Sequence, residues 1–303
     1  MEVVFLGTAG STPTARRSSP AIAIRRGPEL ILLDCGEGMQ RQMVLAGIGM
    51  KSKMRILISH MHGDHVLGLP GLIQTMALFD RKAPLQVYGP EGVFAFIKAM
   101  KETVKFGLTF PIEVKEVQAG IVYDERDYHV ESAWTSHVVP TLAYALVENS
   151  RMGRFQPEKA KVLGIPEGPL WGLLQHGKAV TAPNGQTVDP ELVVGQPRLG
   201  RRVVYSGDTS PCKSILELAK GADLLIHEAT FADSLAEKAS QMGHSTPSQA
   251  ADVAKKAGAL RLVLTHISGR YDEDEGFLEG SKRVFPGVLL AEDLMVLTVP
   301  LRD

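Results

Sequence analysis

The chain has 303 residues with 33 basic and 34 acidic side chains, and its net charge of −1 predicts no partner by bulk electrostatics. Hydrophobic residues make up 44% of it, enough for the core of one large α/β domain or two smaller ones. No apolar run approaches the roughly 18 residues of a membrane span, and Glu2 stands where a signal peptide needs a base. Two distant cysteines, Cys35 and Cys212, favour a reducing compartment and leave one disulfide open. We therefore expect a cytoplasmic protein without a membrane partner.

Short apolar runs recur just before Gly, Asp or His, and many are continuous runs of Val, Ile and Leu, which is typical of strands covered on both faces. The expected strands are Val3–Leu6, Ala21–Ile24, Leu30–Leu33, Met54–Ile58, Leu85–Tyr88, Leu142–Val147, Val203–Tyr205, Leu224–Ile226, Leu262–Leu264 and Leu294–Val299. The expected helices are Pro70–Phe79, Glu91–Glu102, Lys213–Lys220 and Pro247–Ala257, the last with Ser245 or Thr246 as its N-cap. This order favours two sheets packed face to face with helices outside them.

Positive charge gathers near the N-terminus. From Arg16 to Arg55, eight basic residues face three acidic ones, an excess of +5. This excess favours a phosphate-rich partner and a solvated face equally. Arg16 and Arg17 are the candidate phosphate contacts in this patch.

One stretch, Arg151–Arg198, interrupts the alternation of strands and helices. It holds seven Gly and six Pro in 48 residues, a composition that predicts an inserted arm outside the packed core. A linker is the alternative, but apolar residues such as Leu163, Ile165 and Trp171 favour an ordered arm. We therefore expect a single domain over residues 1–303 with this arm inserted. The basic residues in it that could contact a phosphate-rich partner are Arg151, Arg154, Lys159, Lys161 and Lys178.

The most informative segment is His60-Met61-His62-Gly63-Asp64-His65, which follows an expected strand. Imidazole and carboxylate are ligands that zinc accepts. In an extended segment His60 and His62 point the same way, because side chains repeat every two residues. Asp64 and His65 can then face a second centre, so one segment supplies ligands for two metal ions.

Three more candidate ligands stand at the ends of expected strands. His137 precedes Leu142–Val147, Asp208 follows Val203–Tyr205, and His266 follows Leu262–Leu264. Asp208 can bridge two cations through its two oxygens. With the first segment these residues make seven ligands, which suits two four- to five-coordinate metals that share a water.

Glu228 and His244 have no obvious metal to bind. A carboxylate beside an imidazole fixes its orientation and raises its pKa, so Glu228 would make His244 a better proton donor. The structural alternative for His244 is a helix cap, a role that Ser245 and Thr246 already fill.

The motifs together resemble the metallo-β-lactamase superfamily and, within it, the ribonuclease Z family. The motifs that carry the resemblance are F-L-G-T-A-G-S-T-P-T-A-R-R (Phe5–Arg17), L-L-D-C-G-E-G (Leu32–Gly38), H-M-H-G-D-H-V-L-G-L-P-G (His60–Gly71), H-E-A-T-F (His227–Phe231), G-H-S-T (Gly243–Thr246) and L-T-H-I-S-G-R-Y (Leu264–Tyr271). The superfamily implies an α/β fold, a four-layer αβ/βα sandwich with the site at one edge. The family implies an endonuclease that removes the 3′ trailer from precursor tRNA, a homodimer, and an arm that grips the body of the tRNA.

The resemblance also implies a mechanism with two Zn²⁺ ions per subunit, although Mn²⁺ or Fe²⁺ suits the same ligands. The first ion would be held by His60, His62, His137 and Asp208, and the second by Asp64, His65, His266 and Asp208. Asp64 is the candidate proton acceptor, and His244, oriented by Glu228, would protonate the departing 3′-oxygen. The products would be a tRNA with a 3′-hydroxyl and a trailer with a 5′-phosphate.

Three other functions stay open. A small-molecule phosphodiesterase of the same fold would need neither the arm nor the basic N-terminal segment. A thioesterase or lactamase would not need Glu228 and His244. An inactive RNA-binding module would not need a full ligand set.

Overall fold

The computed structural model describes residues 1–50, 53–271 and 276–302. They divide into two compact units. The sandwich unit contains residues 1–147 and 202–300, and the insert unit contains residues 148–201 with Leu301 and Arg302. Within the described residues, no helix is both long and apolar enough to cross a membrane.

The first sheet of the sandwich unit has seven strands in the order β18-β1-β3-β4-β5-β6-β7. Their bounds are β1 Glu2–Gly7, β3 Ala21–Arg26, β4 Glu29–Leu33, β5 Lys53–Leu57, β6 Leu85–Gly89, β7 Ile112–Glu116 and β18 Val296–Thr298. Strands β4 to β7 are parallel to one another, so their carboxyl ends lie at one edge. The helices that belong with this sheet are α1 Met39–Leu45, α2 Gly63–Val66, α3 Gly68–Leu78 and α4 Val93–Thr103.

The second sheet also has seven strands, in the order β17-β15-β14-β13-β10-β9-β8. Their bounds are β8 Gly120–Asp124, β9 Tyr128–Trp134, β10 Leu142–Glu148, β13 Arg202–Tyr205, β14 Leu224–Glu228, β15 Leu262–Thr265 and β17 Leu289–Leu290. Strands β13, β14, β15 and β17 are parallel. Its helices are α7 Lys213–Leu218, η2 Asp233–Leu235, α8 Ala236–Gln241, α9 Pro247–Ala257, η3 Gly269–Tyr271 and α10 Glu279–Val284.

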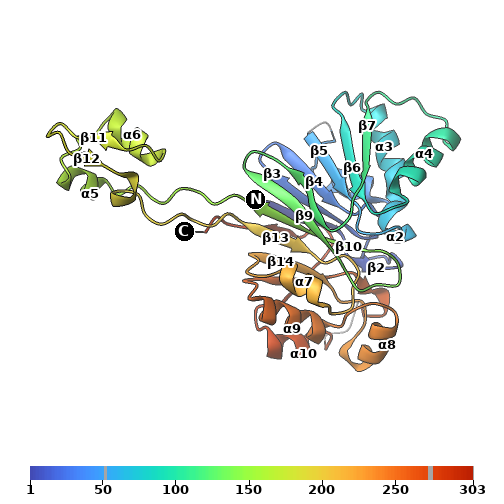
Figure 1. Ribbon diagram of the computed structural model, residues 1–303. Helices are drawn as coiled ribbons and strands as arrows, with labels where there is room; N and C mark the ends of the chain where they lie inside the picture. The colour runs from blue at the N-terminus through green and yellow to red at the C-terminus, as the bar shows by residue number, and fades with distance from the viewer. Residues whose placement is uncertain (51–52, 272–275, 303) are drawn as a thin grey trace. The chain divides into compact units, whose positions relative to one another are not determined.

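Alternating side chains sort the core into three buried layers. Val4 and Leu6 of β1 pack under helices α1 and α3, whereas Val3 and Phe5 pack between the two sheets. A third cluster lies between the second sheet and α7, α9 and α10. Figure 1 shows α3 and α4 outside the first sheet and α9 and α10 outside the second. The expected four-layer αβ/βα sandwich is thus confirmed.

Each of the ten expected strands and four expected helices is present, with shifts of a few residues at its ends. Helix α9 begins as expected, because Thr246 is its N-cap and forms a capping box with Gln249, and Pro247 occupies the first turn. A small parallel pair, β2 (Ala9–Gly10) and β16 (Ile267–Ser268), joins the loop after β1 to the segment after β15.

The insert unit has a core of its own. Its elements are α5 Pro157–Val162, α6 Pro169–Gln175, β11 Val180–Thr181, β12 Thr187–Val188 and η1 Pro190–Leu192. Ile165 and Leu174 are buried in this core, and Trp171 packs against it, while Leu173 is exposed. The two ends of the insert run side by side, because Arg151 and Arg198 exchange backbone hydrogen bonds of 2.8 Å.

The N-terminal basic segment does not form one positive surface. Arg17 is buried and donates hydrogen bonds to the Thr8 hydroxyl and the Ala291 carbonyl, both at 2.7 Å. Other members pair with acids: Arg25 with Glu2, Arg26 with Asp127, and Arg55 with Glu125. Lys51 lies outside the described residues. The counted excess of +5 therefore overstated the free charge, and of the two candidate contacts in this patch only Arg16 is exposed.

Candidate metal centre

The candidate ligands meet at the edge where parallel strands of both sheets end. His60 follows β5 by three residues, Asp208 follows β13 by three, and His266 directly follows β15. Because the carboxyl ends of parallel strands share an edge, residues far apart in sequence converge there. Two backbone hydrogen bonds connect the loops at this edge. Leu142 N donates to the Ser59 carbonyl at 2.9 Å, and Ser210 N donates to the Ser136 carbonyl at 2.8 Å.

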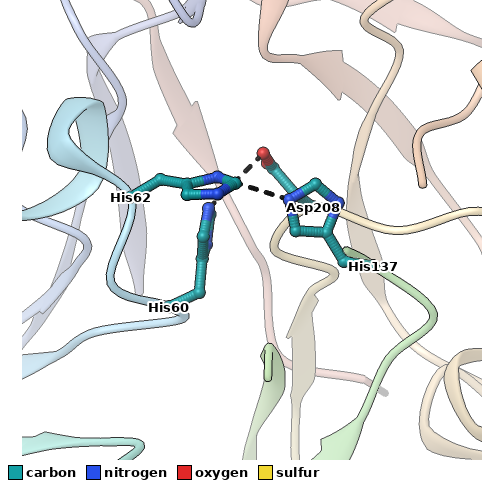
Figure 2. Close-up of side chains that lie close together, drawn as sticks. All are labelled: His60, His62, His137 and Asp208. Carbon is teal, nitrogen blue, oxygen red and sulfur yellow. Dashed lines mark hydrogen bonds and ion pairs between the residues drawn. The ribbon is translucent and has the colours of Figure 1, made fainter. Parts of the chain in front are cut away.

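The first group of ligand atoms belongs to His60, His62, His137 and Asp208, shown in Figure 2. All of these atoms lie within 4.8 Å of one another. His62 Nδ1 is 3.4 Å from His137 Nε2, and His60 Nε2 is 3.7 Å from Asp208 Oδ2.

The second group contains Asp64, His65 and His266. His65 Nε2 and His266 Nε2 are 3.3 Å apart, and each lies 3.4 Å from Asp64 Oδ2. Asp208 Oδ2 is 3.6 Å from His65 Nε2 and 3.5 Å from His266 Nε2. Asp208 thus adjoins both groups, and the structure brings together all seven predicted ligands.

The donor spacing fits a divalent cation. Ligands about 2.0–2.1 Å from a tetrahedral zinc lie roughly 3.3–3.4 Å from each other, close to the distances in both groups. His60 Nε2 and Asp208 Oδ1 are buried and have no hydrogen-bond partner among the described residues. Because buried polar atoms are normally paired, these two orphan atoms indicate a site for a cation.

Charge in the cluster points the same way. Burial and the nearby His65 lower the pKa of His60 to about 2, and burial also lowers the pKa of His137, so both imidazoles are neutral and able to bind a metal. Burial opposes charge on His65 and Asp208, yet carboxylates raise the pKa of His65 and imidazoles hold that of Asp208 well below its ordinary value. The cluster thus offers neutral imidazoles and an ionised carboxylate, the forms in which these groups bind a metal.

Asp34 anchors the ligands from behind, a role that the sequence did not reveal. Its carboxylate accepts hydrogen bonds from Ser59 N at 2.6 Å, from His65 Nδ1 at 2.7 Å and from the Tyr205 hydroxyl at 2.7 Å. The bond to Nδ1 leaves Nε2 of His65 aimed at the second group. Carboxylates in this position orient histidine ligands and increase their basicity.

Glu228 and His244 form the expected pair beside the ligands. His244 Nδ1 donates to Glu228 Oε1 at 2.8 Å, which leaves Nε2 as the free ring nitrogen. Burial opposes charge on His244, but the bond and charge of Glu228 outweigh it and raise the pKa of His244 to about 9. Glu228 is itself fixed by Thr209 N at 2.9 Å and by Thr230 N at 3.0 Å.

Thr230 is the second residue whose role sequence reasoning missed. Its hydroxyl donates to Glu228 Oε2 at 2.6 Å and lies 2.8 Å from His266 Nδ1. The Thr230 side chain thus links the His244–Glu228 pair to a candidate ligand. Asp34 and His266 both have positive φ, 61° and 57°, which is uncommon for residues other than glycine and is frequent at functional sites.

Comparison with known proteins agrees with this fold and site. Residues 175–267 match a family model described as a beta-lactamase superfamily domain, and residues 1–153 match one described as anti-Pycsar protein Apyc1. A four-layer sandwich with a His/Asp cluster at its edge defines a metal-dependent hydrolase of the metallo-β-lactamase superfamily.

Relatives that span the whole chain narrow the family. The chain is 50% identical to ribonuclease Z of Methanosarcina acetivorans and 48% identical to that of Methanosarcina mazei, over 100% of this chain and 99% of each relative. Its fold matches the crystal structure of the short form of human tRNase Z with a TM-score of 0.74 and 30% identity, over 99% of this chain and 100% of that one. The chain belongs to the ribonuclease Z family.

Proposed function

We propose that this chain is an endoribonuclease that removes the 3′ trailer from precursor tRNA. The cut leaves a 3′-hydroxyl on the tRNA and a 5′-phosphate on the trailer. The observation that carries the proposal is the His244–Glu228 pair beside a seven-ligand cluster, in a chain 50% identical over its full length to a ribonuclease Z. A phosphodiester hydrolase needs both groups. The ligand cluster would bind the scissile phosphate, and the His244–Glu228 pair would protonate the alcohol that leaves.

We infer two Zn²⁺ ions per chain; the same ligands accept Mn²⁺ or Fe²⁺. The first would be held by His60, His62, His137 and Asp208, and the second by Asp64, His65, His266 and Asp208. When bound, such ions neutralise charge on the scissile phosphate and lower the pKa of water from 15.7 toward ~7.

The protein moves the two protons of the reaction. Burial disfavours charge on Asp64, but hydrogen bonds from His266 and His65 hold its pKa well below the ordinary range, so its carboxylate is ionised. This carboxylate is the proposed acceptor of the proton of the attacking water. The water oxygen bonds to phosphorus as the bond from phosphorus to the 3′-oxygen breaks. His244 Nε2 then gives its proton to that oxygen, while Glu228 keeps the ring in place.

The insert unit would hold the body of the tRNA. Four of its candidate residues, Arg154, Lys159, Lys161 and Lys178, are exposed, whereas Arg151 is half-buried and donates to the Arg302 carbonyl at 2.7 Å. Guanidinium and ammonium groups contact phosphates without reading sequence, which suits an enzyme that must accept every tRNA. Arg16 of the sandwich unit is a further proposed contact.

We also propose a cytoplasmic homodimer. The thiols of Cys35 and Cys212 are both free, which fits a reducing compartment. Leu67, Leu78 and Phe79, on and beside α3, are exposed by 55%, 78% and 50% and are candidate subunit contacts. Sedimentation equilibrium of the purified chain measures the subunit number.

The test of the proposed function is cleavage of a 3′-extended precursor tRNA with both new ends mapped. We expect one cut at the base of the acceptor stem, a 3′-hydroxyl on the tRNA, and loss of the cut on chelation. The same preparation is given bis(p-nitrophenyl) phosphate. Turnover of this ester without any cut in the precursor would instead support a small-molecule phosphodiesterase.

A further inference from the structure

A cavity of about 470 Å³ is lined by His244 but not by His137. It lies between the loop after β2, the segment after β16 and helix α8, and its walls include Thr12, Phe231, Lys238 and Met242. This volume falls within the roughly 300–1,000 Å³ of sites that hold small molecules. The cavity is therefore large enough for one nucleotide.

The walls combine an apolar platform with the basic side chains of Lys238 and Arg270. Met242 is 49% exposed, and the Phe231 ring lies 5.8 Å from both His244 and the Lys238 ammonium. Aromatic rings and thioethers are surfaces on which a nucleobase stacks, and an ammonium attracts a phosphate. Thr12 adds a hydroxyl that can hydrogen-bond to a ribose or a base.

A second cavity, of about 740 Å³, borders the metal centre at His137. Its walls carry the carboxylates of Glu91 and Glu116 and the indole of Trp134, and no Lys or Arg among the described residues lines it. The two cavities thus differ in charge. Charge alone does not set the direction of an RNA strand across the centre, because every nucleotide carries a phosphate.

The position of His244 fixes that direction. His244 donates its proton to the 3′-oxygen that leaves, an assignment that rests on the proposed function. The ribose bearing this oxygen belongs to the last nucleotide of the tRNA, on the 5′ side of the cut. Because His244 lines the cavity of Met242 and Lys238, that ribose lies at the mouth of the same cavity.

We infer that this cavity is the subsite for the last nucleotide of the tRNA, with its base against Met242 and Phe231 and its 5′-phosphate toward Lys238. Met242 and Lys238 then help to determine how fast each tRNA is cut. The first nucleotide of the trailer lies on the side of Trp134.

The test pairs modified precursors with variants of the full chain. One precursor has an abasic site at the last tRNA nucleotide, and a second has it at the first trailer nucleotide. For the wild type we expect the first modification to lower kcat/KM about tenfold, since base stacking contributes roughly 1–3 kcal/mol and about 1.4 kcal/mol is a factor of ten. In Met242→Ala the same modification should lower kcat/KM by no more than about twofold.

Trp134→Ala is the matched control, because it removes an aromatic platform of similar exposure from the other cavity. In this variant the abasic site at the last tRNA nucleotide should still lower kcat/KM about tenfold. The opposite result would be a tenfold loss of kcat/KM from this abasic site in Met242→Ala but not in Trp134→Ala. It would reverse the assigned direction and overturn the inference. Both side chains are partly exposed, so thermal unfolding should be near that of the wild type for each variant.

Lys238→Gln adds a second readout. It should reduce the slope of log(kcat/KM) against log[salt] by roughly one phosphate contact, and an unchanged slope would contradict the phosphate contact. A wild type that leaves the unmodified precursor uncut would refute the proposed function itself. A wild type that cuts both modified precursors as fast as the unmodified one would refute only the subsite.

Discussion

Asp208 is the residue on which both halves of the ligand cluster depend. Its Oδ2 lies 3.5–3.7 Å from Nε2 of His60, His65 and His266, and its Oδ1 is buried without a partner among the described residues. A fully buried carboxylate surrounded by imidazoles is costly unless positive charge compensates it. The geometry of this one side chain therefore argues for cations at this edge of the sandwich more strongly than the number of histidines does.

The His244–Glu228 pair predicts a pH effect. Glu228 raises the pKa of His244 to about 9, above its ordinary 6.5, so the proton donor stays charged through neutral pH and loses its proton as pH rises through the raised value. Glu228→Gln removes the negative charge, and the alkaline limb of the kcat/KM profile should move to lower pH. Cations held by the cluster would lower the pKa of His244 in both proteins, so the prediction concerns the difference between the two profiles. Coincident alkaline limbs would contradict the assigned role.

Among single residues, the sequence predicts those that are chemically distinctive and close together in the chain. The segment from His60 to His65 is recognisable as a candidate metal site from its composition alone. Asp34 and Thr230 do not, because Asp34 acts through Ser59, His65 and Tyr205, which are 25, 31 and 171 residues away. Only the folded chain brings such partners together.

The loop before α9 shows how one element positions two functional groups. His137 Nδ1 donates to the Gly243 carbonyl at 2.8 Å, and His244 follows in the chain. Gly243 has φ of +71°, and a Cβ there would lie 2.9 Å from both Cα and Nδ1 of His137. This close approach requires glycine, so the loop holds a candidate ligand and the proposed proton donor in fixed positions.

Gly243→Ala should therefore weaken metal binding. The added methyl group displaces His137, and we expect about 10–100-fold lower affinity, the usual effect of disturbing a ligand's support, measured by competition with a chromophoric chelator. The control is Gly258→Ala at the end of α9, where φ is +66° but no atom lies within 4 Å. It should cost roughly 1–2 kcal/mol of stability for the backbone conformation and leave metal affinity unchanged. Equal affinities in the two variants would disprove the steric argument.

Apolar runs predicted the central strands because those strands are buried on both faces. Strands β7, β8 and β9 escaped prediction. Strands β7 and β8 lie at sheet edges, and apolar residues of β7 and β9 alternate with polar ones, as in Ile-Glu-Val-Lys-Glu of β7. Edge strands commonly carry such charges, which prevent pairing with other chains. The exposed positive charge of the segment Arg16–Arg55 was overestimated because Arg17 and Arg55 are buried. Their guanidinium groups bind partners that are distant in sequence and that no local pattern shows.

The whole molecule consists of two units with separate cores, and this division predicts the effect of a deletion. Val147 and Arg202 pair in antiparallel strands β10 and β13. Residues 149–200 can therefore be replaced by Asn-Gly, a two-residue turn that suits a hairpin. The three core layers of the sandwich unit contain no residue from the insert, so folding and metal content should persist.

The shortened chain should hydrolyse bis(p-nitrophenyl) phosphate within about twofold of the wild type. Cleavage of precursor tRNA should fall more than about 100-fold, since two lost charged contacts at roughly 1.5–3 kcal/mol each are enough for that loss. Equal loss on both substrates would mean that the insert serves the structure of the active site.

The most direct test of the account is a titration of the metal-free protein with Zn²⁺ while precursor cleavage is followed. We predict no cleavage without metal and full cleavage at two equivalents per chain, with His62→Ala and His266→Ala each unable to reach the wild-type rate. Full cleavage by the metal-free chain, or saturation at a single equivalent, would contradict a two-metal tRNA endonuclease.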